Sequence, residues 1–113
     1  MYAFVVCDSL TSITIPGSVE VIREEAFLSC TGLETIIIKK GVKNIESSAF
    51  LGCKNLKSVN ISNGVEIIGE YAFRDCSSLT SIKILNSITS IGYGAFDGCN
   101  SLKRILVDKK NNS

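Results

Sequence analysis

Five cysteines spaced at one constant interval are the feature that most constrains how this chain can fold. They are Cys7, Cys30, Cys53, Cys76 and Cys99, and each lies 23 residues after the one before it. The same period is kept by five Ala-Phe pairs and by Leu10, Leu33, Leu56, Leu79 and Leu102. Self-similarity at a fixed period of about 20–50 residues indicates stacked structural units. We therefore expect residues 1–113 to form a single repeat domain.

Branched apolar residues fill further columns between each leucine and the next cysteine. The third position after the leucine holds Ile13, Ile36, Val59, Ile82 and Ile105, and the fifth holds Ile15, Ile38, Ile61, Ile84 and Val107. The ninth and twelfth positions after each of the first four leucines are also apolar. One such unit cannot bury its apolar side alone, whereas stacked units bury each column against its own copies.

Each unit is predicted to contain a strand, a turn, a second short strand and one helical turn. Apolar alternation predicts parallel strands near residues 11–15, 34–38, 57–61, 80–84 and 103–107, with the columns described above pointing inward. The stretches "PGS", "KKG", "SNG" and "LNS" that follow indicate turns. Ala-Phe-x-x-Cys suits about one helical turn with Ala and Cys on one face. The expected fold is a solenoid of about five units, with a parallel β-sheet on one face and short strands and one-turn helices on the other.

The unit pattern Leu-x-x-Ile-x-Ile-Pro-x-x-Val-x-x-Ile-x-x-x-Ala-Phe-x-x-Cys resembles the BspA-like, or Treponema pallidum-type, leucine-rich repeat family. The resemblance covers residues 3 to about 107 and rests on Ala-Phe-x-x-Cys in register with the strand. The proline of the family pattern occurs only as Pro16, and later units have Lys39, Ser62 and Leu85 there. The resemblance implies a curved, non-catalytic solenoid that binds at the surfaces of bacteria and of some parasitic or gut-dwelling protists.

Composition argues against several other classes of function. Net charge is +1 and 20% of residues are charged, so no strong field selects nucleic acid or a membrane surface. No apolar run reaches the roughly 18 residues of a membrane span, and the first ten residues lack the basic region of a signal peptide. The chain has no His, the commonest general base and a common metal ligand. We therefore expect no enzyme activity, no metal and no cofactor.

The cysteine column admits four interpretations, and packing fits best. Five is an odd number for disulfides, and a bridge needs Cβ atoms about 3.8 Å apart, whereas thiols of one ladder point the same way. The spacing has no Cys-x-x-Cys pair for zinc, and a nucleophile would not need five copies. Buried Cys behaves as a small apolar residue. We predict that all are reduced, with Cys30, Cys53 and Cys76 buried and with Cys7 and Cys99 more exposed.

Binding specificity is expected at the variable outward positions of the strands. Most of these positions are small and polar, but Ile37, Leu85 and Leu106 are aliphatic. Two interpretations stay open: scattered surface hydrophobics, which are normal, or anchors of a shallow binding face with a basic rim. The second interpretation gives the candidate site Ile37, Lys39, Asn60, Lys83, Leu85, Arg104 and Leu106.

The two ends are expected to be the weakest parts of the stack. The chain begins in mid-unit at Ala3-Phe4 and stops after the fifth strand, without a recognisable cap. It is therefore expected to be part of a longer array or to pair its ends with another copy. Asp108 and the two lysines that follow would blunt the last strand edge. Residues 1–6 and 108–113 should be the most mobile, or buried against a neighbouring copy.

The sequence thus predicts a non-enzymatic protein-binding module. The family resemblance implies a place in a cell-surface or secreted adhesin-like protein, with a host or neighbouring-cell surface protein as the partner and with neither nucleic acid nor membrane insertion. The alternative is a structural spacer or self-assembling solenoid whose uncapped ends associate.

Overall fold

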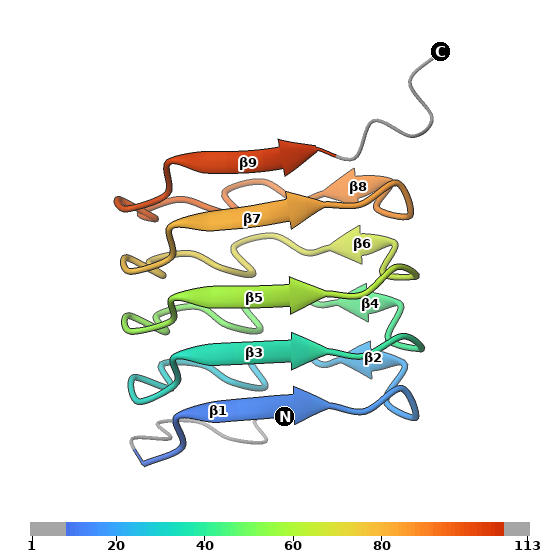
Figure 1. The fold of residues 1–113 in the computed structure, drawn as a ribbon, viewed down its shortest axis with the longest axis horizontal. Helices are drawn as coiled ribbons and strands as arrows, with labels where there is room; N and C mark the ends of the chain where they lie inside the picture. Colours follow the sequence, from blue (N-terminus) through green and yellow to red (C-terminus); the bar gives the residue numbers. More distant parts are fainter. Residues whose placement is uncertain (1–8, 108–113) are drawn as a thin grey trace.

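The computed structural model describes residues 9–107 as a two-layered β-solenoid (Figure 1). The front layer contains β1 (Ser12–Ile15), β3 (Thr35–Ile38), β5 (Ser58–Ile61), β7 (Ser81–Ile84) and β9 (Arg104–Val107). The rear layer contains β2 (Val21–Ile22), β4 (Asn44–Ile45), β6 (Ile67–Ile68) and β8 (Ser90–Ile91). The predictions about Phe4, Cys7 and the tail from Asp108 lie outside the described residues.

The predicted strands and their stacking are confirmed. Except between β5 and β7, neighbouring strands of each layer pair in parallel with partners 23 residues apart, as in Ile13 with Ile36 and Ile36 with Val59. The inward columns form the core, where Ile36 and Ile38 are 0% exposed. Because each column meets its own copies, the apolar side that one unit cannot bury is covered by its neighbours.

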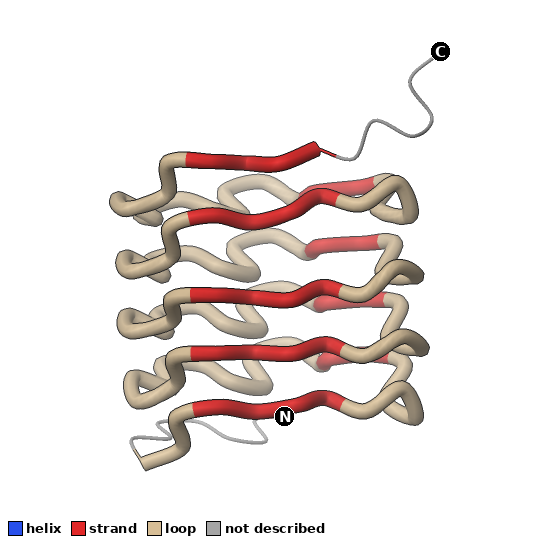
Figure 2. The backbone as a smooth tube through the Cα atoms, in the orientation of Figure 1, coloured by secondary structure: helices blue, strands red, loops and turns tan. Residues whose placement is uncertain are grey.

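The front layer is interrupted, whereas the rear layer is continuous. Front and rear strands stack in two layers (Figure 2). By their pairing, the front strands form one sheet in the order β1-β3-β5 and a second sheet of β7 and β9, while the rear sheet runs β2-β4-β6-β8. Ser62, directly after β5, donates both its backbone N–H and its Oγ to the carbonyl of Ile38, so this end of β5 is bound to β3. Beside the break, the inward residues Ile61 and Ile84 are only half-buried. The break therefore loosens the core at the front.

The predicted one-turn helices are wrong. In the described residues, each Ala-Phe segment is a series of turns rather than a helix. Backbone N–H groups donate three residues back, as from Ala26 to Arg23 and from Cys30 to Phe27. Two positions in each unit have left-handed φ angles, for example 59° at Glu25 and 56° at Ser29. Left-handed residues interrupt the right-handed run that a helix requires.

These turn segments, residues 23–30, 46–53, 69–76 and 92–99, are bonded directly to one another. The alternate N–H groups point to the next unit, where Phe27 donates to Ala49 and Phe50 donates to Ala72. The pattern continues across the level of the front break, because Phe73 donates to Ala95. A helix would use these N–H groups internally, so the turns bind neighbouring units together in a way that a helix could not.

The phenylalanines inside the turn segments form a stacked column. Ring centroids are 5.2 Å apart for Phe27 and Phe50, 5.2 Å for Phe50 and Phe73, and 5.7 Å for Phe73 and Phe96. Phe50 and Phe73 are 0% exposed. The rings and the inward isoleucines therefore share one continuous core between the two layers.

Candidate functional site

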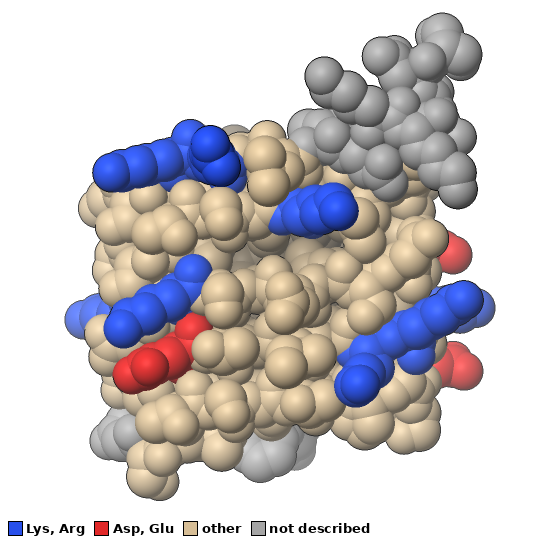
Figure 3. All heavy atoms as spheres, viewed as in Figure 1, with Lys and Arg blue, Asp and Glu red and all other residues tan. Residues whose placement is uncertain are grey.

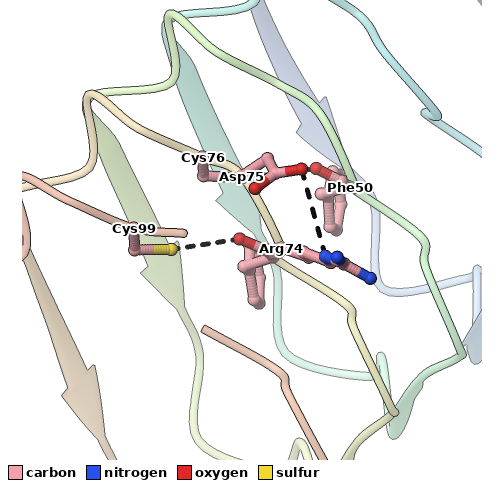
Figure 4. Close-up of polar contacts among 6 residues, drawn as sticks. Phe50, Arg74, Asp75, Cys76 and Cys99 are labelled. Carbon is pink, nitrogen blue, oxygen red and sulfur yellow. Dashed lines mark hydrogen bonds and ion pairs between the residues drawn. The ribbon is translucent and has the colours of Figure 1, made fainter. Parts of the chain in front are cut away.

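The cysteines are donors inside the core. The Sγ atoms of Cys53 and Cys76 donate to the carbonyls of Phe27 and Phe50 at 3.3 Å. The Sγ atom of Cys99 donates to the carbonyl of Phe73 at 3.1 Å, and Figure 4 shows this bond as a dashed line from Cys99. Each carbonyl belongs to the preceding unit, so the thiol adds a polar bond between units. The sequence did not predict this bond, because it depends on where the neighbouring carbonyl lies.

The burial predicted for the thiols is confirmed. Cys30, Cys53 and Cys76 are 0% exposed, Cys99 is half-buried, and no cysteine of the described part is in a disulfide. Loss of solvation on burial raises the pKa of Cys76 and of Cys99, and the neighbouring thiols Cys53 and Cys99 raise that of Cys76 further. A thiol held in its neutral form is a poor nucleophile. The structure therefore gives these cysteines a packing role.

We define the strand face as the outward side chains of the five front strands and of the residues directly before and after each strand. All seven predicted site residues lie on it. Asn60, Lys83 and Arg104 are exposed, as is Lys39, which follows β3. Leu106 is 48% exposed, whereas Ile37 and Leu85 are half-buried. Leu106 thus presents more apolar surface than the other two aliphatic residues.

The front break divides the candidate residues into two groups. Ile37 lies beside Asn60 on the β3–β5 side, and Lys83 lies beside Leu106 on the β7–β9 side. Because no strand pairing joins these pairs, the face is not one uniform ladder. A partner that touches both groups must cross the break.

Basic side chains dominate the strand face. Among the residues that the structure describes, its exposed charged residues are Glu34, Lys39, Lys57, Lys83, Lys103 and Arg104. Figure 3 views this face, with Lys and Arg at both ends of the strands and acidic groups mostly at the margins. Lys57 and Lys103 were not among the predicted site residues, although their shared position directly before a strand could have indicated them.

The opposite surface has the reverse charge. We define the rear face as the outward side chains of β2, β4, β6 and β8 and of the first three residues of each turn segment. Its charged residues are Arg23, Glu24, Glu25, Glu46 and Glu70. The overall charge of +1 therefore conceals a basic face and an acidic face on opposite sides of the solenoid. Sequence analysis by total charge missed this separation, whereas charge counted by repeat position would have found it.

The rear face contains a shallow hollow of about 360 Å³. It is lined by Glu24, Asn44, Ile45, Glu46, Ser47, Ile67 and Gly69. The backbone N–H of Glu24 donates to Oε1 of Glu46 at 3.1 Å, which holds that carboxylate at the edge of the hollow. The hollow thus combines an apolar wall with two carboxylates.

Two tyrosines extend the rear face toward β8. Tyr93 is 73% exposed and meets Tyr71 edge to face, with ring centroids 5.8 Å apart. The Arg74 guanidinium lies 5.1 Å from the centre of the Tyr71 ring and 4.0 Å from the Asp75 carboxylate, a pair shown in Figure 4. An exposed aromatic group of this size is a common anchor at protein interfaces.

Neither a metal site nor a membrane span is found in the described part of the chain. Residues 9–107 place no three His, Cys, Asp or Glu side chains where they could hold a metal ion together. The same residues contain no helix long and apolar enough to cross a membrane.

Solved structures of longer repeat proteins share this fold. A leucine rich cell surface protein from Faecalibacterium prausnitzii A2-165 matches with a TM-score of 0.72 and 25% identity, over 91% of this chain and 33% of the other. A leucine rich repeat protein of T. pallidum matches with a TM-score of 0.60 and 23% identity, over 83% of this chain and 57% of the other. The chain thus spans from a third to somewhat over half of these proteins. No curated protein matches it.

The family assignment rests on a match over the whole sequence. The family described as "BspA type Leucine rich repeat region (6 copies)" matches residues 1–113. The matched residues include the strands, the turns and the cysteine ladder described above. The chain therefore belongs to the BspA-type leucine-rich repeat family.

Proposed function

We propose that this chain is a non-enzymatic protein-binding module of a cell-surface or secreted adhesin-like protein. Its strand face is the docking surface, and the partner presents a negatively charged protein surface. The observation that carries the proposal is the broad array of exposed Lys and Arg side chains on one side of the sheet.

The shape of the strand face supports a macromolecular partner. Strands give a broad, regular surface, whereas the hollow described above lies on the other side of the molecule. A small ligand needs a concave pocket that surrounds most of its surface. Exposed charges on such a face steer a partner of opposite charge and set its orientation. Leu106 and the half-buried Ile37 and Leu85 supply apolar contacts within the basic surroundings.

The chemistry of the chain favours binding over catalysis. There is no His to act as a general base, and burial keeps the Cys76 thiol neutral by raising its pKa. The cell-surface assignment is supported by family membership and by the likeness to the F. prausnitzii cell surface protein.

The proposal is tested with immobilised wild type and two variants. Ile37→Asp with Leu85→Asp removes the apolar contacts, and Lys39→Glu with Lys83→Glu removes the net positive charge of the described strand face without touching the core. A partner captured by the wild type from surface proteins of neighbouring cells is identified, purified and titrated against each form. We expect both variants to weaken binding tenfold or more, which corresponds to about 1.4 kcal/mol.

The matched control is Tyr93→Ala on the rear face, which should bind the partner with unchanged affinity. If it weakened binding while the two strand-face variants did not, the docking surface would be on the rear. If Ile37→Asp with Leu85→Asp unfolded the chain, the charge-reversal variant would decide the question alone.

End-to-end association is a second candidate. Ile91 and Ile105 belong to inward columns, yet they are 45% and 51% exposed at the β8–β9 end of the described stack. An exposed apolar end with an unpaired strand edge favours pairing with another strand. Ile105→Asp would abolish self-association seen by sedimentation if this end is responsible, and would leave it unchanged otherwise.

A further inference from the structure

The two broad faces of the solenoid have complementary composition. On the rear face, Ile67 is 41% exposed and Tyr93 is 73% exposed, and Glu24, Glu46 and Glu70 lie around them. On the strand face, Leu106 and the half-buried Ile37 and Leu85 lie among Lys39, Lys83 and Arg104. Protein interfaces combine an apolar centre with a polar rim, and rims of opposite charge attract each other.

The hollow on the rear face is a consequence of close stacking. The position of Glu46 is occupied in the next two units by Gly69 and Gly92. A Cβ atom at Gly69 would lie 2.7 Å from the backbone nitrogen of Ser47, and one at Gly92 would lie 2.4 Å from that of Glu70. Only glycine fits such short distances, so a strip without side chains is left above Glu46. The hollow lies over the first part of this strip.

The lining of this hollow suits the chemistry of a lysine side chain. Lysine has an apolar stem and a charged end, and it buries the stem along apolar surface while the ammonium group stays polar. Ile67 offers the apolar wall, and the Glu24 and Glu46 carboxylates offer acceptors for the ammonium group. The exposed lysines of the strand face are on the opposite side of the same molecule, so they cannot reach their own hollow.

We propose that copies of this chain dock front to back, with the strand-face lysines of one copy on the acidic rear face of the next. This inference rests on the proposed function, because it names a second copy as the partner of the strand face. The contact joins two different surfaces, so a docked pair still offers one open strand face and one open rear face. Such a contact continues into an open series unless the rotation between copies closes a ring.

Sedimentation velocity tests the inference with three forms of the chain. Each form is measured at about 20 mM salt, where attraction between exposed charges is weakly screened, and at about 300 mM salt, where it is strongly screened. The strand-face variant is Lys39→Glu with Lys83→Glu, and the rear-face variant is Glu24→Lys with Glu70→Lys. We expect the wild type to associate at low salt, with its dissociation constant raised tenfold or more at high salt. Each variant alone should be monomeric, because its two faces then no longer have net charges of opposite sign.

An equimolar mixture of the two variants gives the decisive measurement. In the mixture, the basic strand face of the rear-face variant can dock on the acidic rear face of the strand-face variant, so association between the two variants should return. The matched control is Lys40→Glu with Lys54→Glu, which reverses two exposed lysines at the turns between the faces and should associate as the wild type does.

The other outcomes separate this inference from the function on which it rests. A wild type that stays monomeric at low salt, or a mixture that stays monomeric, overturns front-to-back docking and leaves docking of a different acidic protein intact. If only the strand-face variant lost association, the strand face would dock elsewhere on the second copy, and the inference would fail alone. Association that survives in both variants but is lost in Ile105→Asp would replace it with end-to-end pairing.

Discussion

The front sheet and the turn segments are built from the same repeat but hold neighbouring units together differently. Between β5 and β7 the strand ladder is missing, and Ile61 and Ile84 are partly exposed there. At the same level of the stack, the turn segments keep their backbone bonds, the Cys99 thiol bond and the stacking of Phe73 on Phe96. The turn segments thus maintain the stack where the sheet does not.

This difference indicates which contacts hold neighbouring units together. A parallel ladder offers one kind of bond, whereas the turn segment combines backbone bonds, a thiol donor and a fully buried ring. Losing part of one ladder therefore leaves several other contacts between the same units. The strand face is free to vary in sequence and local geometry, which is what a binding surface requires.

The largest effect is expected when the ring column is broken. Phe50→Ala should cost about 3–5 kcal/mol of unfolding free energy, because a fully buried ring that stacks on two neighbours leaves a cavity. Ile61→Ala beside the front break should cost clearly less, since its side chain is already half-exposed. Urea unfolding of both variants measures the difference. Equal costs would show that the front sheet holds the stack as firmly as the turns do.

A smaller effect is expected for one thiol of the turn segments. Cys53→Ala should cost about 1–2 kcal/mol, through the lost bond to the Phe27 carbonyl and the small cavity. In the native state Cys53 should react slowly with a thiol reagent and the half-buried Cys99 faster. Rapid native labelling of Cys53 would contradict its burial.

The buried thiols should also make stability depend on alkaline pH. The pKa of Cys76 is raised in the fold, so the folded state retains the proton that the unfolded chain releases near pH 8.5–9. The contribution is fully present below that pH and is lost as pH rises, at up to about 1.4 kcal/mol per pH unit. Unfolding curves of wild type and Cys76→Ala between about pH 7 and pH 10 isolate this effect, since other groups titrate in both. Parallel pH profiles would be inconsistent with a buried, neutral thiol.

The smallest effect is expected on the solvent side of the turn segments. Arg74 and Asp75 are 47% and 55% exposed with their charged atoms 4.0 Å apart, so Arg74→Ala should cost at most about 0.5 kcal/mol. A thermal melt at low and high salt checks both the size and the screening. A loss near that of Cys53→Ala would mean that the contact of Arg74 with the Tyr71 ring matters more than its exposure suggests.

The strands and the turn segments differed in how well they could be predicted. Period-two alternation around Ile36 and Ile38 predicts that their side chains point inward, because successive side chains of a strand point to opposite faces of the sheet. Ala-Phe-x-x-Cys also suits a helical turn. The helix is prevented by residues in the left-handed conformation, among them Glu25, Ser48 and Tyr71, which have no intrinsic preference for that conformation. Hydrogen bonds to the next unit select the left-handed conformation, and no local sequence pattern predicts those bonds.

The candidate site was also predictable only in part. Outward positions of the strands follow from the period alone, so the sequence is enough to place Ile37, Asn60, Lys83 and Leu106 on one face. The break that separates them could not be predicted from the apolar columns, since Ile61 and Ile84 match their counterparts in the other units. The repeat positions of Glu24, Glu46 and Glu70 were enough to predict the acidic rear face, whereas the total charge of the chain conceals it.

The sequence by itself determined the number of units, their parallel register and which columns are inward, because each apolar column can be buried only against its own copies in adjacent units. The tertiary structure alone decided the turn conformation, the thiol bonds and the break between β5 and β7. The turn conformation and the break depend on hydrogen bonds between backbone groups of neighbouring units, and each thiol bond depends on where a neighbouring carbonyl lies. Every residue has such groups whatever its side chain, so the distance and angle between units decide whether they pair.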